Sequence, residues 1–212
     1  MYAIHKHPMK EKPLKKTLDR KFYHQPTLDL AKALLGCLLV KETREGTASG
    51  IIVETEAYMG PDDRAAHSFG GRRTKRTEVM FGEPGITYTY SMHTHCLFDV
   101  VSGEIGQPHA ILIRAVEPFS GEELMTIRRP KARNGIELTN GPGKLAKALG
   151  ITMDDYGHPL DRSPLWIAEG NSIEMEQIAT GPRIGIQNTG DAVHYPWRFW
   201  INGNKFVSPK SR

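Results

Sequence analysis

The order of helix-like and strand-like segments limits the possible folds of this chain more than any other feature. The predicted elements in chain order are a helix at 27–36, strands at 37–41, 50–58, 86–91 and 110–117, helices at 121–129 and 140–150, and strands at 183–187 and 198–203. A parallel, doubly wound sheet would instead alternate strand and helix regularly. The order therefore predicts an α+β fold with a largely antiparallel sheet. No linker rich in Pro, Gly or Ser divides the 212 residues, so a single domain is expected.

Residues at the predicted helix ends give the helix boundaries. Thr27 is expected to cap the first helix, which would end at Gly36. Ser120 and Glu123 have the spacing of a capping box. Pro142 would stand in the first turn of the last helix, where the missing amide hydrogen costs nothing.

Charge is distributed unevenly along the chain. The whole sequence has 28 Lys or Arg and 24 Asp or Glu, a net charge of +4. Residues 1–21 carry seven Lys or Arg against two acids, and residues 154–177 carry six acids against one Arg. Such segregation is typical of a protein that meets a polyanion with one face. Residues 1–16 are also readily interpreted as a solvated tail.

Cysteine content and hydropathy restrict the cellular setting. Cys37 and Cys96 are the only cysteines, so a multi-disulfide framework and a Cys-x-x-Cys zinc site are excluded. The longest mainly apolar run, residues 33–40, is too short to span a bilayer. The first residues contain no apolar secretory stretch. These features predict a cytoplasmic protein without membrane contacts.

The segment 53–58 presents two carboxylates and an aromatic ring at alternate positions. In a strand, Glu54, Glu56 and Tyr58 share one face, and the small or apolar residues between them share the other. A carboxylate beside an aromatic ring can have a shifted pKa and act as a general base. The competing interpretation is a solvent-exposed strand face with ordinary acids.

A long loop rich in Gly and Pro, residues 59–85, follows this strand. Its cluster of cations consists of Arg72, Arg73, Lys75 and Arg76. Cations and backbone amides in such a loop can bind phosphates, although a charged run is more commonly only solvated. His67 stands in the same loop with no partner evident from sequence, and its default interpretation is structural.

The next strand carries aromatic residues and several potential metal ligands. Tyr88 and Tyr90 share one face, which suits either base stacking or packing in the core. His93, His95 and Cys96 lack the second spaced pair of ligands that a closed zinc site needs, so no metal site is expected.

Two other cations stand at informative positions. Arg114 lies within the apolar run 110–116, where an arginine needs a carboxylate partner or an anionic ligand. Lys144 follows Gly141-Pro142-Gly143 at a predicted helix N-terminus, which suits phosphate binding. The glycine spacing and the missing Ser/Thr exclude a Walker loop.

Taken together, these segments resemble the alkyladenine (3-methyladenine) DNA glycosylase family, of the methylpurine-DNA glycosylase type. The resemblance rests on the runs KFYHQPTLDLAKALLGCLLV, GIIVETEAYMGPDDRAAHSFGGRRTKRTEVMF, PGITYTYSMH, AILIRAVEP, LTNGPGKLAKALGI and PRIGIQ. It implies one domain over residues 19–208 with a curved, open-barrel-like sheet and short peripheral helices. Residues 1–18 would form a basic tail and residues 209–212 a short second one.

The resemblance implies roles for individual residues. Glu56 would be the general base, and Arg114 would help to hold the catalytic water and the nearby nucleotide backbone. Tyr58 and Tyr90 would stack on opposite faces of an extruded base, and His67 would contact it. The residues expected to contact DNA around the pocket are Arg72, Arg73, Thr74, Arg76, Met92, His93 and Lys144.

Two positions depart from the family pattern. The chain is one residue shorter after Tyr90, so Met92 or His93 takes the place of the family tyrosine that inserts into the duplex. A pocket asparagine of the family corresponds to Asp99. An acidic group there changes the hydrogen-bonding pattern and would favour cationic bases.

The resemblance implies a DNA repair enzyme that acts on double-stranded DNA. It would extrude an alkylated or deaminated purine, such as 3-methyladenine, 7-methylguanine or hypoxanthine. Water activated by Glu56 would hydrolyse the N-glycosidic bond and leave an abasic site. No cofactor, metal ion or lyase activity is implied. We expect a monomer, associated with the nucleoid in a bacterium, whose basic segments share one face with Glu56 and whose segment 154–177 lies away from it.

Two alternatives stay open at this point. A module that binds damaged DNA without catalysis could keep the same scaffold, but it would not need a buried carboxylate. A metal-dependent nuclease could use Glu54, Glu56, Asp62 and Asp63, and EDTA would inhibit it.

Overall fold

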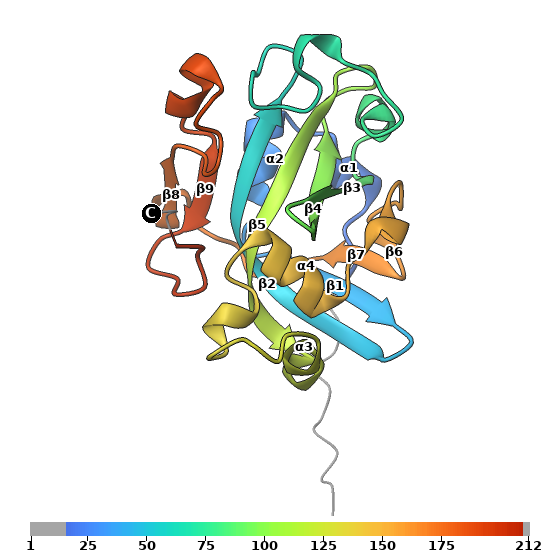
Figure 1. Ribbon diagram of the computed structural model, residues 1–212, viewed down its shortest axis with the longest axis vertical. Helices are drawn as coiled ribbons and strands as arrows, with labels where there is room; N and C mark the ends of the chain where they lie inside the picture. The colour runs from blue at the N-terminus through green and yellow to red at the C-terminus, as the bar shows by residue number, and fades with distance from the viewer. Residues whose placement is uncertain (1–15, 210–212) are drawn as a thin grey trace, which may run out of the picture.

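A curled antiparallel sheet is the framework of the computed structural model, which describes residues 16–209 (Figure 1). Its strands are β1 (Leu38–Thr43), β2 (Gly46–Met59), β3 (Thr87–Met92), β4 (His95–Ser102), β5 (His109–Ser120), β6 (Asp161–Arg162), β7 (Leu165–Ala168), β8 (Ile178–Gly181) and β9 (Arg198–Ile201). The α-helices around the sheet are α1 (Arg20–Tyr23), α2 (Thr27–Ala33), α3 (Glu122–Arg128) and α4 (Pro142–Leu149). The predicted α+β fold with one curved antiparallel sheet is confirmed. Among the described residues, no helix is long and apolar enough to cross a membrane.

The long strand β2 changes its neighbour halfway along its length. The sheet order is β3-β4-β5-β2-β1-β7-β6, and residues 46–51 of β2 pair with β1. Glu54, Thr55 and Glu56 pair instead with β9, which Figure 1 shows beside β2. The β2–β5 register shifts on both sides of Glu54. Such bulges redirect side chains and are frequent beside active sites, and here they flank Glu54, two residues before Glu56.

Side chains on the two faces of β2 enter different buried environments. Thr55 faces α2 and donates a hydrogen bond to the carbonyl oxygen of Ala31 at 2.8 Å. Glu54, Glu56 and Tyr58 share the opposite face, as the alternation predicted. Both carboxylates have no exposed surface, so the interpretation as a solvent-exposed strand face is wrong. The C-terminal segments after β8 and β9 contact and cover this face.

The main hydrophobic core joins the sheet to the helices. It includes Leu30 and Leu34 of the α2 region, Phe98 and Val100 of β4, Ile111 and Ile113 of β5, and Leu145 and Leu149 of α4. These side chains are at most a few per cent exposed. Burial of this size is the dominant favourable contribution to folding. It fixes the sheet as a rigid support for the residues on its other face.

The two edges of the sheet are connected through residues 156–160. The backbone amide of Thr87 in β3 donates to the carbonyl oxygen of His158 at 2.8 Å, and the amide of Gly157 donates to that of Thr87 at 2.9 Å. Ile86 and Pro159 form an isolated bridge. Since this segment leads directly into β6 at the other edge, it curls the sheet into an open barrel.

Two predicted helix caps are wrong. Helix α2 begins at Thr27 itself, with Pro26 before it, and the Thr27 hydroxyl contacts Nδ1 of His109 at 2.9 Å. Ser120 is the last residue of β5, where its hydroxyl contacts that of Ser49 at 2.7 Å. In both cases a tertiary hydrogen bond has replaced the local capping bond that the sequence suggested.

The predicted strand at 183–187 is a loop, and its polar groups explain why. The amide of Ile184 donates to Oε1 of Glu56 at 2.7 Å instead of to a neighbouring strand. Gly185 has φ +83°, a left-handed conformation that strands do not use. Strand β8 precedes this loop, and β9, which was predicted, follows it. Strand β8 was not predicted, and neither were β4, β6 and β7.

The packed chain begins before the predicted domain boundary at residue 19. Thr17 forms a bridge with Ala168 of β7, and the side chain of Leu18 is buried. Residues 16–18 thus belong to the domain because they extend the sheet edge. The rest of the predicted N-terminal tail and residues 210–212 lie outside the described part of the chain.

Candidate active site

A cavity of about 220 Å³ opens on the face of the sheet that carries Glu56. Its walls include Tyr58, His67, Tyr90, Met92, Asp99 and Arg114, six residues that the sequence analysis singled out. They come from β2, the 59–85 loop, β3, β4 and β5. Residues 184–186 of the loop after β8 also line the cavity. The curl of the sheet therefore brings separate sequence motifs to one place.

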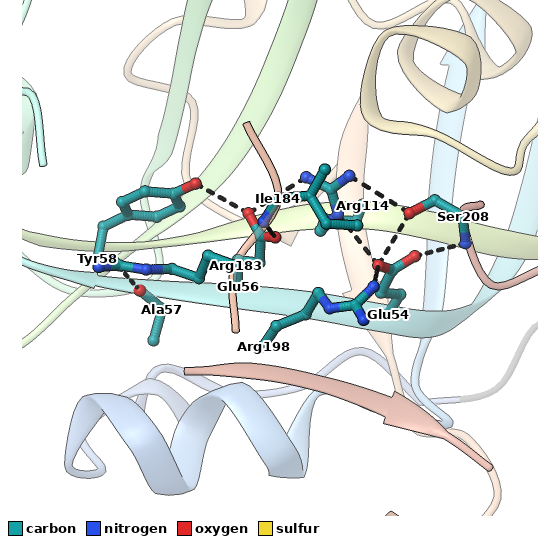
Figure 2. A network of polar contacts seen from close by, with 9 residues as sticks. All are labelled: Glu54, Glu56, Ala57, Tyr58, Arg114, Arg183, Ile184, Arg198 and Ser208. Carbon is teal, nitrogen blue, oxygen red and sulfur yellow. Dashed lines mark hydrogen bonds and ion pairs between the residues drawn. The ribbon is translucent and has the colours of Figure 1, made fainter. Parts of the chain in front are cut away.

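Glu56 lies directly behind the wall of this cavity. Its Oε1 accepts a hydrogen bond from the amide of Ile184 at 2.7 Å, and its Oε2 accepts from the Tyr58 hydroxyl at 2.8 Å and from Nη1 of Arg114 at 3.2 Å (Figure 2). All three donors line the cavity, whereas Glu56 itself does not. The carboxylate is held in a fixed orientation by groups that a ligand in the cavity would touch.

Burial raises the pKa of Glu56 above its usual value. Arg114, the Ile184 amide and the Tyr58 hydroxyl oppose this rise, in that order, and the neighbouring charge of Glu54 adds to it. A carboxylate whose pKa is raised towards the working pH is a stronger base than an exposed one. The environment of Glu56 therefore suits proton abstraction.

Asp99 is a second buried carboxyl on the cavity wall. Its Oδ1 has no hydrogen-bond partner among the described residues. Burial, and then the charge of Glu56, raise the pKa of Asp99 well above its usual value, while Arg76 lowers it. An unpartnered buried oxygen that lines a cavity is available to a ligand.

Three rings form the aromatic part of the cavity. Tyr88 and Tyr90 stack with their centroids 5.1 Å apart, and the His67 ring meets Tyr90 edge-on at 4.7 Å. The Tyr88 hydroxyl lies 2.9 Å from Nδ1 of His67. Burial, and then the charge of Arg76, lower the pKa of His67 to about 4. His67 is therefore neutral at physiological pH and does not repel a cation in the cavity.

We expect the His67 ring to stay neutral from pH 8 down to about pH 5. The unfolded chain takes up this proton near pH 6.5, but the folded one does so only near pH 4. Acidification between these values therefore lowers the free energy of unfolding. NMR titration of the ring protons measures the pKa directly. Replacing Arg76 by Ala should raise it, and a titration midpoint near pH 6.5 in the unsubstituted protein would refute the assignment.

Arg183 is a residue of this site that the sequence analysis missed. Its guanidinium lies 4.7 Å from the centroid of Tyr58 and 5.0 Å from that of Trp197. It pairs with Asp63 at 2.8 Å, and both side chains are fully buried. The run PRIGIQ was noticed only as part of a resemblance and interpreted as a strand. Arg183 supports the Tyr58 ring from one side.

Arg76 is part of the cavity region rather than a free cation of the loop. Its guanidinium lies 5.1 Å from the centroid of Tyr90, and its Nε donates to the Tyr88 hydroxyl at 3.2 Å. It also contacts Nε2 of His67 at 3.1 Å. This arginine orders the aromatic rings.

The other residues predicted to contact DNA from the loop differ in their surroundings. Arg72 is exposed. Arg73 pairs with Glu78, with Nε to Oε2 at 3.0 Å, and both side chains are exposed. The amide of Thr74 donates to the Thr77 hydroxyl at 2.9 Å, which fixes the turn. The loop is therefore ordered by its own polar contacts.

The β3–β4 hairpin and helix α4 flank the mouth of the cavity. Met92 lines the cavity and is 41% exposed. His93 has φ +46° and lies in the exposed turn of the hairpin. Lys144 in α4 donates to Oδ1 of Asn140 at 2.7 Å, and Pro142 at the start of the helix lines the cavity. Of the two candidates for the inserted side chain, Met92 is the one on the cavity wall.

The acidic segment 154–177 is not wholly separate from the basic loop, contrary to the prediction. The Tyr156 hydroxyl donates to the carbonyl oxygen of Lys75 at 3.1 Å. Asp155 is buried in an ion pair with Lys41. Tyr156 thus packs against the loop, and the acid before it, Asp155, is neutralised by a lysine of β1.

Comparison with known proteins identifies the family. A family model described as methylpurine-DNA glycosylase (MPG) matches residues 21–205. The chain belongs to the methylpurine-DNA glycosylase family. Curated relatives include proteins of Bacillus licheniformis, 61% identical over 196 residues, and of Bacillus subtilis, 61% identical over 194 residues. These matches cover 92% of this chain, and 98% and 97% of the relatives respectively.

A more distant relative agrees with this assignment. A protein of Listeria monocytogenes is 47% identical over 187 residues, which are 88% of this chain and 89% of that one. All three relatives carry the name "Putative 3-methyladenine DNA glycosylase". The resemblance inferred from sequence is confirmed, and the chain is a DNA glycosylase by family.

Three of the four carboxylates of the nuclease alternative are engaged in ion pairs, and the fourth, Asp62, is exposed. Glu54 and Glu56 both pair with Arg114, and Asp63 pairs with Arg183. No group of three His, Cys, Asp or Glu within residues 16–209 could hold a metal ion. The family assignment and these ion pairs favour the glycosylase over the nuclease.

Proposed function

We propose that this glycosylase removes alkylated purines, with 3-methyladenine as a principal substrate, by accepting the extruded nucleotide from double-stranded DNA into the cavity beside Glu56. The observation that carries the proposal is a fully buried carboxylate behind an aromatic wall, with its three hydrogen-bond donors facing the cavity. Binding to DNA would not need a carboxylate buried in this way. The names of the relatives support the same substrate.

The cavity favours a cationic purine. Tyr58 and Tyr90 offer ring faces that would stack on the extruded base, and His67 would contact its edge. Alkylated purines such as 3-methyladenine and 7-methylguanine are positively charged, so cation–π attraction adds to stacking. The neutral His67 avoids repulsion. A neutral purine such as hypoxanthine would gain less from this environment.

The chemical step is a hydrolysis in which Glu56 acts as the base. Glu56 takes a proton from a water molecule, and the water oxygen forms a bond to the sugar C1′. The bond from C1′ to the purine nitrogen breaks, and its electron pair leaves with the base, which neutralises a cationic purine. Arg114 would hold the water and the nucleotide backbone. A single displacement of this kind inverts C1′.

The surface around the cavity mouth would hold the DNA. Met92 would insert into the base stack where the nucleotide has left, since apolar side chains serve as such wedges. Arg72, Arg73 and Lys144 would contact phosphates, which makes binding sensitive to salt. One extruded nucleotide needs one cavity, so a monomer that acts at the nucleoid of a bacterial cell is the proposed form.

Release of free base tests this function directly. Duplexes that each carry one 3-methyladenine, 7-methylguanine or hypoxanthine should release the base and leave an abasic site, with EDTA present. Strand cleavage without base release would instead indicate a nuclease. Borohydride should trap no covalent adduct with DNA, because the mechanism uses water as the nucleophile.

Asp99 is expected to set the preference for cationic bases. Burial raises the pKa of Asp99, and a cationic purine in the cavity would lower it again by stabilising the ionised form. The ionised carboxylate then accepts a charge-assisted hydrogen bond, which is stronger than a neutral one. Replacing Asp99 by Asn should therefore slow excision of 7-methylguanine about tenfold more than excision of hypoxanthine. Single-turnover rates on the two substrates measure this ratio. An unchanged ratio would show that Asp99 does not discriminate between them.

A further inference from the structure

Glu54 is a second fully buried carboxylate, and the proposed reaction gives it no role. Its Oε1 accepts hydrogen bonds from Nε of Arg114 at 3.1 Å, from Nη1 of Arg198 at 3.1 Å and from the Ser208 hydroxyl at 2.9 Å. Its Oε2 accepts from the Ser208 amide at 2.7 Å. A carboxylate that accepts four hydrogen bonds has little freedom to rotate. Glu54 is thus a fixed anchor point beside the catalytic base.

The Arg114 guanidinium is held by one partner at each of its three nitrogens (Figure 2). Nε donates to Glu54 at 3.1 Å, Nη1 donates to Glu56 at 3.2 Å, and Nη2 donates to the Ser208 hydroxyl at 3.3 Å. Two of these three partners are not catalytic in the proposed mechanism. A planar guanidinium held at every nitrogen has a single orientation, so Glu54 and Ser208 determine where Arg114 meets Glu56.

Ser208 comes from a part of the chain that is remote in sequence. It lies seven residues after the end of β9, and 154 residues separate it from Glu54. The serine is buried, and both its amide and its hydroxyl donate to Glu54. The hydroxyl also accepts a hydrogen bond from Arg114, so this one oxygen atom contacts both Glu54 and Arg114. The C-terminal segment therefore completes the polar network of Glu54 and Arg114.

We propose that Glu54 and Ser208 are positioning residues for the glycosylase reaction, and that the C-terminal segment around Ser208 fixes the Arg114–Glu56 pair. This inference rests on the proposed role of Glu56 as the base. Neither residue lines the cavity, and both contact Arg114, which does. Ser208 acts through Arg114, and Glu54 acts both through Arg114 and through its charge.

The charge of Glu54 also acts on Glu56. Among the described residues, the charged or titratable groups that surround Glu56 come from five strands. They are Glu54 and Tyr58 on β2, Tyr90 on β3, Asp99 on β4, Arg114 on β5 and Arg198 on β9. Arg114 is shared between the two glutamates. Without the negative charge of Glu54, Arg114 would interact more strongly with Glu56, and one repulsive charge would be removed. Both effects favour the ionised form of Glu56.

Ser208→Ala tests the positioning role with a small change. Ser208→Ala removes two hydrogen bonds of the hydroxyl, one to Glu54 and one from Arg114. We expect the single-turnover rate of 3-methyladenine excision to fall about fivefold to tenfold, because Arg114 keeps its bonds to Glu54 and Glu56. Affinity for DNA that carries an abasic analogue should be unchanged. Ser208→Thr keeps the hydroxyl and should restore most of the rate. Ser49→Ala, which removes another buried hydroxyl on the hairpin of β1 and β2, is the matched control and should keep the full rate.

Glu54→Gln tests whether the charge of Glu54 influences the protonation of Glu56. Besides a slower reaction, the acid limb of the pH–rate profile should move to lower pH, because Glu56 would lose its proton more readily. The same shift should appear in the Asp99→Asn background, which removes the other buried carboxyl near Glu56. The proposal would be overturned if the rate of Glu54→Gln fell only in proportion to the fraction of folded protein and the acid limb of its pH–rate profile stayed in place. An unchanged rate in Ser208→Ala would also overturn it.

A failure of the positioning role can be distinguished from a failure of the proposed function. If the unsubstituted protein released no base, or if Glu56→Gln retained full activity, the assignment of the base would be wrong. If the unsubstituted protein is active and Glu56→Gln is not, the Ser208 and Glu54 variants test only the positioning role. The Arg114 Nε–H signal in NMR gives a readout without substrate. Its exchange with water should be faster in Ser208→Ala and unchanged in Ser49→Ala.

Discussion

Replacing Glu56 by Gln is expected to slow excision of 3-methyladenine by about 1000-fold, the order of a general base's contribution. Glutamine has the same shape but cannot take a proton from water. Its side-chain oxygen can still accept the hydrogen bond that the Ile184 amide now donates to Glu56. Because burial raises the pKa of Glu56, a neutral side chain is also tolerated there. Single-turnover rates at pH 7 with excess protein measure the effect.

Binding and a second glutamate provide the controls for this variant. Glu56→Gln should bind DNA that carries an abasic analogue about as tightly as the unsubstituted protein. Glu117→Gln is the matched control, since Glu117 is a partly buried glutamate on β5 that accepts from Asn204 outside the cavity. It should keep the full rate. Residual excision within tenfold of the unsubstituted protein would rule out Glu56 as the base.

Replacing Asp63 by Ala is expected to lower the free energy of unfolding by about 3–5 kcal/mol, the cost of leaving a buried charge without its partner. The Arg183 guanidinium lies between the rings of Tyr58 and Trp197. Neither member of the Asp63–Arg183 pair is exposed. Without Asp63, the guanidinium would keep only its bonds to backbone carbonyl oxygens of Ala57 and Ala192. Urea denaturation measures the loss.

The neighbouring acid gives a close comparison for this substitution. Asp62 is exposed, and Asp62→Ala should change the free energy of unfolding by less than about 0.5 kcal/mol. A similar small change in Asp63→Ala would mean that Arg183 finds another partner or water. Excision should also slow in Asp63→Ala even where the protein is folded, because Arg183 supports the Tyr58 ring. A full rate in the folded variant would contradict that support.

Much of the fold could be predicted from local patterns, and the failures have physical reasons. The strands that contain Glu56, Tyr90 and Arg114 were predicted because apolar and β-branched residues repeat at the period of a strand. The predicted caps at Thr27 and Ser120 failed because tertiary partners took their hydroxyls. The predicted strand at 183–187 failed because the amide of Ile184 binds a carboxylate instead of another strand.

The candidate site shows a similar division. Alternation placed Glu54, Glu56 and Tyr58 on one face, but the sequence left open whether that face was exposed. Resemblance to the family then named the residues around the cavity. It gave no role to Arg183 or Ser208, whose contacts with the site depend on the loop after β8 and the segment after β9. A pattern with a period of two residues carries no information about segments more than 100 residues away.

The sequence by itself determined the fold class, the family and the face on which the two carboxylates lie. Each of these follows from residues close together in the chain or from a motif as a whole. Only the tertiary structure decided that Glu54 and Glu56 are fully buried and that Arg114 is shared between them. It also decided that Oδ1 of Asp99 has no hydrogen-bond partner within residues 16–209. The physical reason is that desolvation and ion pairing depend on what covers a side chain. Here the covering groups, Ile184 and Ser208, lie 128 and 154 residues from the carboxylates that they bind.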